Sequence, residues 1–354
     1  MKGEPPRPLD NVAKIAVLVP HSIGDFMFTL PALHALKHGY PDAELVIIGK
    51  PWQADFLRGR PGPVDRVLLL PPVDGVGGFP DADSEPVERF VEQARAERFD
   101  IAVQLYGGGR FSNPFVARLG ARLTAGTRAD DAPALDRWVR YAQPNNRRLA
   151  LLEVAEQAGA VARLADQELC VTDDDRREAA AVLPPGAGQP LVLLQPGSTD
   201  PRRCWPPERF AAVGDALAGA GARIAVNGTA AEASLVRTVI DAMRHPAIDL
   251  SGKLGLRGLC GLLERVAMLV SNDTGPLHMA LAIGTPAVGI FWLTNLIDGT
   301  PLRQGLLRVA LSVRVHCPAC GAVNLRTRCP HNDSFVSDVP LEEVTGLAMS
   351  LLRT

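Results

Sequence analysis

Two series of alternating strand and helix patterns constrain the fold of this chain most strongly. In each series, short apolar runs typical of buried parallel strands are followed by stretches with helical spacing, and a break rich in Pro, Gly and Asp at residues 166–190 separates the series. This alternation predicts parallel sheets covered by helices. We therefore expect an α/β protein with two Rossmann-like, doubly wound domains facing a cleft, at residues 12–170 and 190–335, and a closing helix at 340–354.

The expected elements follow from apolar spacing and from Gly and Pro breaks. In the first half, strands are predicted at residues 14–19, 44–49, 66–70, 101–105 and 122–126. Helices are predicted at 28–38, 51–58 and 87–98, and a further helix ends near residue 158. Residues 71–86 are predicted to form a loop. In the second half, strands are predicted at 191–194, 223–226, 266–270, 287–291 and 309–313. Helices are predicted at 206–220, 256–265, 279–283 and 340–352, with a short polar helix that starts at 173–175 and another that bears Glu232.

Composition limits the class of protein. The 354 residues, 47% of them apolar and 21% charged, suit two globular domains, and the net charge of −2 argues against a nucleic-acid partner. The sequence contains neither a secretory signal nor an apolar run of the ~18 residues that a membrane-spanning helix needs. We therefore expect a cytoplasmic protein, with peripheral contact to the inner membrane surface left open.

Polar residues 271–278 lie between a predicted strand and a predicted helix. Their position is the carboxyl end of a strand, where open α/β sheets bind ligands. The N–H groups at a helix start favour an anion, most often a phosphate. The alternative is an ordinary loop, because Asp, Thr and Gly are also selected by turn geometry alone.

Two further turns of the second half could bind the same ligand. Residues 196–199, followed by Arg202 and Arg203, combine Gly, hydroxyl groups and guanidinium groups, which suits a diphosphate. Residues 227–229 lead to Glu232, and a carboxylate near a nucleotide commonly binds the ribose hydroxyls. The sequence has neither a Walker-type phosphate loop nor a Gly-x-Gly-x-x-Gly motif. ATP hydrolysis and a nicotinamide cofactor are therefore not expected.

In the first half the candidate is Asp25, at the carboxyl end of the first strand. A helix start would keep its pKa low, but the residue could equally serve only as a helix cap. Residues 107–110 include three Gly that either admit a ligand or form a flexible loop. Four arginines flank the helix that ends near residue 158, and a solvated face is expected, with an anionic substrate as the alternative. They are Arg137, Arg140, Arg147 and Arg148.

Cys317, Cys320, Cys329 and His331 have the density of a metal site. The first pair has ligand spacing, but the second half is irregular for a zinc module. We expect a loop with incidental thiols, no bound metal, and activity that survives chelators.

Several motifs, in this order and spacing, resemble those of family 9 glycosyltransferases, the ADP-heptose:lipopolysaccharide heptosyltransferases and their relatives. The resemblance runs from about residue 12 to the end of the chain. The motifs are His21-Ser22-Ile23-Gly24-Asp25 with Thr29-Leu30-Pro31-Ala32-Leu33, Pro196-Gly197-Ser198 with Trp205-Pro206, Gly228-Thr229 with Glu232, Asp249-Leu250-Ser251-Gly252, and Asn272-Asp273-Thr274-Gly275-Pro276-Leu277-His278 with Gly284-Thr285-Pro286.

The resemblance implies a GT-B fold, with the acceptor in the first domain and a nucleotide-sugar donor such as ADP-heptose in the second. It further implies an inverting, metal-independent transfer to a glycan or glycolipid such as a lipopolysaccharide core, without a cofactor. Asp25 matches the proposed base, and Arg203 stands where heptosyltransferases carry a Lys that stabilises the leaving group. Ser198 and Thr199 match the phosphate contacts and Glu232 the ribose contact.

The resemblance also places the donor loop. Its residues are Asp273, Thr274, Gly275 and His278. The alternatives are another GT-B enzyme, such as a nucleotide-sugar epimerase, and a non-catalytic nucleotide-sugar-binding protein.

Overall fold

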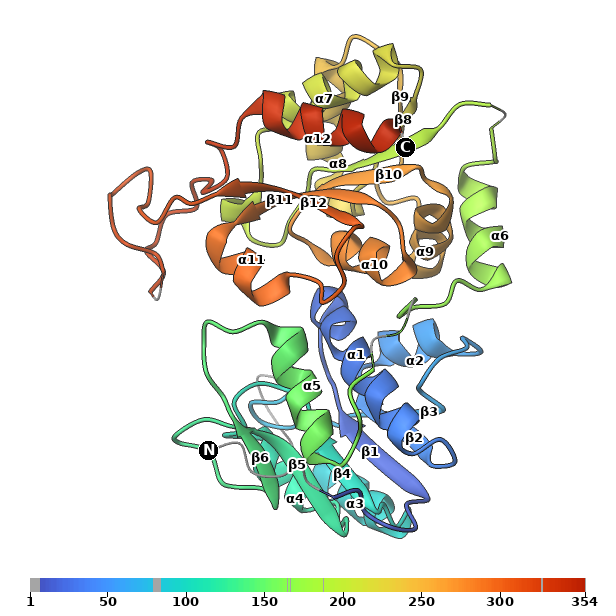
Figure 1. Cartoon of the computed structure of the whole chain (residues 1–354), viewed down its shortest axis with the longest axis vertical. Helices are drawn as coiled ribbons and strands as arrows, with labels where there is room; N and C mark the ends of the chain where they lie inside the picture. The colour runs from blue at the N-terminus through green and yellow to red at the C-terminus, as the bar shows by residue number, and fades with distance from the viewer. Residues whose placement is uncertain are drawn as a thin grey trace. The chain divides into compact units, whose positions relative to one another are not determined.

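The computed structural model describes residues 7–78, 84–163, 165, 167–186, 188–325 and 327–353. The chain divides into two compact units, Met1–Cys170 and Val171–Thr354. Each unit contains one six-stranded parallel sheet with helices packed against it (Figure 1). Part of the loop predicted at 71–86 lies outside the described residues.

The sheet of the first unit has the strand order β3-β2-β1-β4-β5-β6. Its strands are β1 (Lys14–Leu18), β2 (Glu44–Gly49), β3 (Arg66–Leu69), β4 (Ile101–Gln104), β5 (Leu123–Arg128) and β6 (Arg137–Arg140). Its helices are α1 (Ile23–Gly39), α2 (Pro51–Leu57), α3 (Ser84–Ala96), α4 (Ser112–Ala117) and α5 (Arg147–Gln157). Helices α3 and α4 pack against alternate strand residues such as Ala16 and Val46, and α1 packs against α5 on the other face (Figure 1).

The sheet of the second unit has the order β12-β11-β10-β7-β8-β9. Its strands are β7 (Leu191–Gln195), β8 (Arg223–Val226), β9 (Ala247–Asp249), β10 (Met268–Asn272), β11 (Ala287–Trp292) and β12 (Leu307–Ser312). Its helices are α6 (Asp173–Val182), α7 (Pro207–Gly219), α8 (Ala233–Ala242), α9 (Leu256–Arg265), α10 (Gly275–Ile283), α11 (Leu293–Gly299) and α12 (Leu341–Leu352), with the 3₁₀ turns η1 (Pro201–Arg203) and η2 (Ala230–Glu232).

Two helices lie near the ends of the second unit in sequence and pack against its other elements. Helix α6 packs against α9, where the guanidinium of Arg176 forms an ion pair with Glu264. The second unit therefore begins earlier than residue 190. The closing helix α12 packs against α7 and against the strands β10, β11 and β12 of the same unit.

Both sheets have the doubly wound strand order. In each, the first strand of the unit lies beside the fourth, so the direction of winding reverses between β1 and β4 and between β7 and β10. Ligands of open α/β sheets bind at the carboxyl ends of the strands at this switch point. The strand order thus locates one candidate site in each unit.

The structure corrects several predicted boundaries. Helix α1 begins at Ile23 instead of residue 28, which places Asp25 in its first turn. Strand β10 ends at Asn272, which shortens the predicted turn to Asp273 and Thr274. The short elements β6, β9, α4 and α11 were not predicted. Among the described residues, no helix combines the length and apolar character needed to cross a membrane.

Candidate active site

Two turns meet at the switch point of the second unit. Strands β7 and β10 are parallel neighbours that end at the same edge, with Gln195 paired to Ser271. The Asn272 side-chain amide donates to the Pro196 carbonyl at 2.7 Å. The hydroxyl of Ser198 donates to the Asp273 carbonyl at 3.3 Å. Hydrogen bonds therefore hold the turn after β7 against the turn after β10.

A buried carboxylate organises the charges at this edge. Asp273 is 4% exposed, and its two oxygens accept from different partners. Arg203 Nη1 lies 3.2 Å from Oδ2, and His278 Nε2 lies 2.9 Å from Oδ1. A buried carboxylate requires such partners to offset its lost hydration. Because both oxygens are engaged, Asp273 holds Arg203 and His278 in place, while the Arg203 side chain keeps a third of its surface exposed.

The two neighbouring arginines differ in their surroundings. Arg202 makes a bidentate ion pair with Asp200, with Nε 3.0 Å from Oδ1 and Nη2 2.6 Å from Oδ2, and its side chain is only 11% exposed. Its charge is therefore matched within the segment. Arg203 is the more accessible of the two cations and faces the edge where β10 ends.

The carboxylate of Glu232 lies against Gly197, in the turn at the same edge of the sheet. A Cβ atom added to Gly197 would lie 1.9 Å from Glu232 Oε1, so only glycine permits this approach. Glu232 Oε2 accepts from the Thr229 backbone N–H at 2.8 Å and from the Thr229 hydroxyl at 3.0 Å. The third predicted turn, after β8, therefore lies beside the first.

The remaining predicted residues of this unit lie at helix α10 and on the loop after β7. Thr274 occupies the N-cap position of α10 without a side-chain capping bond, and Gly275 is the first helical residue. Thr199 is exposed beside Ser198. The positive end of the α10 dipole thus lies at the edge that carries Arg203.

In the first unit, Asp25 pairs with an arginine. Arg147 Nη1 lies 2.5 Å from Asp25 Oδ1, and the Ser22 hydroxyl donates to Oδ2 at 3.1 Å. Asp25 stands in the first turn of α1 and Arg147 is the first residue of α5, so the starts of two packed helices adjoin the carboxylate. Their dipoles favour its negative form.

The pKa of Asp25 reflects two opposing effects. Burial raises it, but the charge of Arg147 and the hydrogen bond from Ser22 outweigh burial, and the pKa lies below its ordinary value. Asp25 is therefore ionised at neutral pH. Burial lowers the pKa of the neighbouring His21 to about 4, so that ring is neutral, and its Nε2 donates to the Leu105 carbonyl at 2.7 Å.

A pocket in the first unit adjoins this ion pair. It lies at the carboxyl ends of β4 and β5 and extends along the loop before α5. Its polar lining comprises His21, Thr127, Arg140, Tyr141, Gln143, Asn145 and Arg147. Gly107, from the Gly run after β4, also lines it.

The expected solvated face is wrong for one of the four arginines. Arg148 is 2% exposed, and its guanidinium lies 4.5 Å from the centre of the Phe28 ring. Arg147 is engaged by Asp25. Sequence spacing missed the pair of Asp25 and Arg147 because 122 positions separate them.

Comparison with known proteins places this geometry in a family. The family described as "Glycosyltransferase family 9 (heptosyltransferase)" matches residues 87–319, which is well over half of the chain. The chain belongs to glycosyltransferase family 9.

This glycosyltransferase is 22% identical to lipopolysaccharide heptosyltransferase 3 of Escherichia coli, over 93% of this chain and 96% of the relative. Its fold matches a family 9 glycosyltransferase from Veillonella parvula with a TM-score of 0.76 and 20% identity, over 96% of this chain and 97% of that one. It also matches the E. coli ADP-heptose lipopolysaccharide heptosyltransferase II with a TM-score of 0.74 and 18% identity, over 96% and 98%. The expected GT-B fold is confirmed, and the protein is an enzyme.

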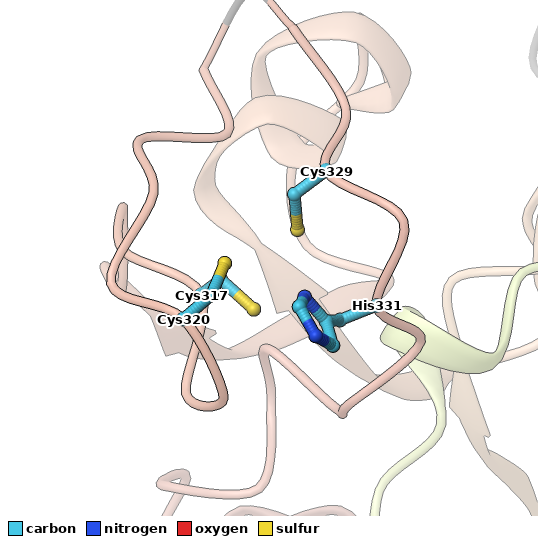
Figure 2. Close-up of side chains that lie close together, drawn as sticks. All are labelled: Cys317, Cys320, Cys329 and His331. Carbon is cyan, nitrogen blue, oxygen red and sulfur yellow. The ribbon is translucent and has the colours of Figure 1, made fainter.

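One group of side chains in this glycosyltransferase lies away from the predicted site residues. The potential ligand atoms of Cys317, Cys320, Cys329 and His331 all lie within 4.8 Å of one another (Figure 2). The sequence predicted incidental thiols without metal, and that expectation did not anticipate such convergence.

Proposed function

We propose that this glycosyltransferase moves heptose or a related sugar from a nucleoside-diphosphate-sugar to a glycan or glycolipid acceptor such as a lipopolysaccharide core. The observation that carries the proposal is the meeting of Ser198, Arg203 and Glu232 at the switch point of the second unit. The named heptosyltransferase relatives support heptose and lipopolysaccharide. We place the reaction on the cytoplasmic side, with peripheral membrane contact left open.

The donor would bind at the second unit. Arg203 and the start of helix α10 would face the diphosphate, because both present positive charge at the same edge. The hydroxyl of Thr199 would donate to a phosphate oxygen, and that of Ser198 would do so by giving up its bond to the Asp273 carbonyl. Glu232 would accept from the ribose hydroxyls. Asp273 acts as a positioning residue, since its oxygens already hold Arg203 and His278.

The acceptor would bind at the first unit. The pocket beside Asp25 carries the cations Arg140 and Arg147, which suits an acceptor with negative charge. Its hydroxyl and amide groups, such as those of Thr127 and Gln143, suit sugar hydroxyls. Asp25 is the base in this proposal because it is ionised and lies at the carboxyl end of the central strand.

The transfer would proceed with inversion. The acceptor oxygen forms a bond to the anomeric carbon as the bond from that carbon to the diphosphate oxygen breaks, and the proton of the acceptor hydroxyl passes to Asp25. The leaving nucleoside diphosphate carries away the electron pair of the broken bond. Arg203 and the α10 start stabilise its charge, so the proposal needs no metal at the reacting atoms.

A two-stage assay tests the proposal. Thermal shift with a panel of nucleotide-sugars identifies the donor, and incubation with truncated lipopolysaccharide acceptors then measures transfer, with product configuration read by NMR. We expect an ADP-sugar to stabilise the protein and the product to have inverted configuration. Epimerisation or hydrolysis of the donor without any transfer would contradict the proposal and favour a different GT-B enzyme.

A further inference from the structure

Three thiols and an imidazole converge in the segment between β12 and α12. Their potential ligand atoms all lie within 4.8 Å of one another. Figure 2 shows the sulfur atoms of Cys317, Cys320 and Cys329 directed toward a common centre, with the His331 ring on its remaining side. All three cysteines are free thiols.

This spacing is close to that of a tetrahedral metal site. With metal–sulfur bonds of about 2.3 Å, neighbouring tetrahedral ligands lie about 3.8 Å apart. Ligand atoms within 4.8 Å therefore need to move by only about 1 Å to complete such a site. Three thiolates with one imidazole form a donor set typical of zinc or iron.

The backbone holds the first two thiols in a tight turn. Gly321 N donates to the Cys317 carbonyl at 2.9 Å, and Cys317 N donates to the Ala322 carbonyl at 2.9 Å. Gly321 has a φ of +71°, a conformation that favours glycine directly after Cys320. The turn thus places two thiols three positions apart on the same side, as metal ligation requires.

The other two ligands have supporting contacts. The buried Asn324 accepts from Cys329 N at 3.1 Å and donates from Nδ2 to Cys329 Sγ at 3.4 Å, so it orients that thiol. The Nδ1 atom of His331 is buried and has no hydrogen-bond partner among the described residues. A buried nitrogen without a partner is unfavourable, and a metal ion would supply one.

We propose that Cys317, Cys320, Cys329 and His331 bind one tetrahedral transition-metal ion, zinc or iron, which holds the segment before α12 against the segment that carries Arg203. Four protein ligands leave no open position, so the role is structural. This proposal reverses the sequence-based expectation of incidental thiols.

The second part of the proposal follows from contacts just beyond His331. The Ser334 hydroxyl donates to the Cys204 carbonyl at 2.7 Å, and Phe335 N donates to the Arg202 carbonyl at 2.8 Å. These bonds flank Arg203 on both sides. A metal ion that fixes His331 would therefore restrain the backbone of Arg203; the consequence for donor binding rests on the proposed function.

Metal content provides the first test. The full chain is purified under reducing conditions, and zinc and iron are measured by elemental analysis for the wild type, Cys320→Ser, and the control Cys170→Ser, whose thiol lies in the other unit. We expect about one metal ion per chain in the wild type and control, and its loss in Cys320→Ser. Elemental analysis distinguishes zinc from iron. Metal-free wild type that also fails to take up zinc chloride would overturn the proposal.

Two further readouts remain informative if Cys320→Ser does not fold. Wild-type protein stripped by a chelator and titrated with cobalt(II) chloride should develop the absorption of tetrahedral cobalt with thiolate ligands, whereas octahedral cobalt absorption would contradict the site. Asn324→Ala should lower metal affinity by about 10–100-fold. Unchanged affinity would contradict its supporting contact with Cys329.

Hydrogen exchange tests the link to Arg203 without any donor. Amides of residues 202–204 should exchange faster after metal removal, whereas helix α8 should be unaffected. Unchanged exchange at 202–204 would refute the restraint. The nucleotide dissociation constant, measured separately, would rise after metal removal if the proposed donor site is also correct, so the two proposals can fail independently.

Discussion

Arg147 donates a hydrogen bond from Nη1 to Oδ1 of Asp25 at 2.5 Å, although 122 positions separate the two residues. The pair forms where the first turns of α1 and α5 adjoin. The arginine keeps the carboxylate ionised in spite of its burial and orients one of its oxygens. The other oxygen, Oδ2, accepts from the Ser22 hydroxyl at 3.1 Å.

The variant Asp25→Asn distinguishes a role of Asp25 as the catalytic base from a role as a helix cap. Asn keeps the size of the side chain and caps helices about as well as Asp, but it cannot take a proton. Transfer should fall by about 10²–10⁴-fold at saturating donor and acceptor. Thermal stability and donor affinity should stay close to those of the wild type, and near-wild-type transfer would eliminate Asp25 as the base.

Arg147→Gln should change the pH dependence of transfer. The proposed base must be ionised to accept a proton, and the charge of Arg147 holds the pKa of Asp25 below its ordinary value, so the wild type should lose activity only in strongly acidic solution. Without Arg147, burial dominates and the pKa of Asp25 rises. The acid limb of the pH–rate profile should therefore move to higher pH.

Arg140→Gln is the matched control for that shift. Arg140 lines the same pocket, but its nearest described carboxylate is Asp130 at 3.5 Å. We expect this variant to alter the KM for acceptor without moving the acid limb. An acid limb that is the same in the wild type and Arg147→Gln would show that Arg147 does not control the ionisation of Asp25.

Arg203→Ala should weaken binding of the nucleoside diphosphate by about 1.5–3 kcal/mol, the range for a hydrogen bond to a charged group. Calorimetry with ADP measures the effect, and the exposed Arg237→Ala, in the same unit, serves as the control. Asp273→Asn should also weaken binding, because Asn cannot offer charge to both Arg203 and His278. Unchanged affinity in Arg203→Ala would remove this residue from the site.

Sequence patterns predicted the central strands well because those strands are buried on both faces and read as apolar runs. The bounds of β2 and β8 match the prediction residue for residue. The edge strand β6 was missed because its four residues, Arg-Trp-Val-Arg, form neither an apolar run nor an alternation of apolar and polar residues, and none of them is buried. The three-residue β9 is too short to show a period.

The residues proposed for the donor site could be named from sequence because each lies in a turn or helix start that comes after a predicted strand. Sequence spacing could not show which of these residues contact one another. Asp273 was expected to belong to the donor loop, but its contacts with Arg203 and His278 become visible only when the turns after β7 and β10 meet. The partner of Asp25 was missed for the same reason.

Gly197→Ala tests the close approach of two turns. The new Cβ would lie 1.9 Å from Glu232 Oε1, so the carboxylate must move away from the edge of the sheet. Nucleotide affinity should fall while the melting temperature changes little. Gly219→Ala, where a Cβ meets nothing within 4 Å, is the control and should bind normally. Equal affinities in both variants would argue against a ribose contact from Glu232.

The ionised Asp215 should add to the free energy of unfolding by an amount that depends on pH. It is 5% exposed and accepts from the backbone N–H groups of Arg244 and His245, each at 2.9 Å. Burial raises its pKa, but these bonds prevail and lower it to about 2. Because the folded-state pKa is depressed, the increment is present above the unfolded-state value of about 3.9 and is lost as pH falls toward 2.

Asp215→Ala should therefore lower the free energy of unfolding at pH 7 by about 1–3 kcal/mol, because two N–H groups lose their acceptor. Urea denaturation at several pH values measures the difference. The difference in the free energy of unfolding between wild type and variant should become smaller as pH falls below 4. A difference in unfolding free energy that is constant over this pH range would show that packing, and not the ionised carboxylate, accounts for the lost stability.

The division of the strands between the two sheets has a consequence for how such enzymes diversify. Strands β1–β6 pair only among themselves, as do β7–β12, and the chain passes from one set to the other between Cys170 and Val171. A recombination at that point exchanges one half of the gene without breaking a strand ladder in the other. Under the proposed function, acceptor range could then evolve by replacement of the first half while the donor is retained, and chimaeras joined at this position would be a route to new glycans.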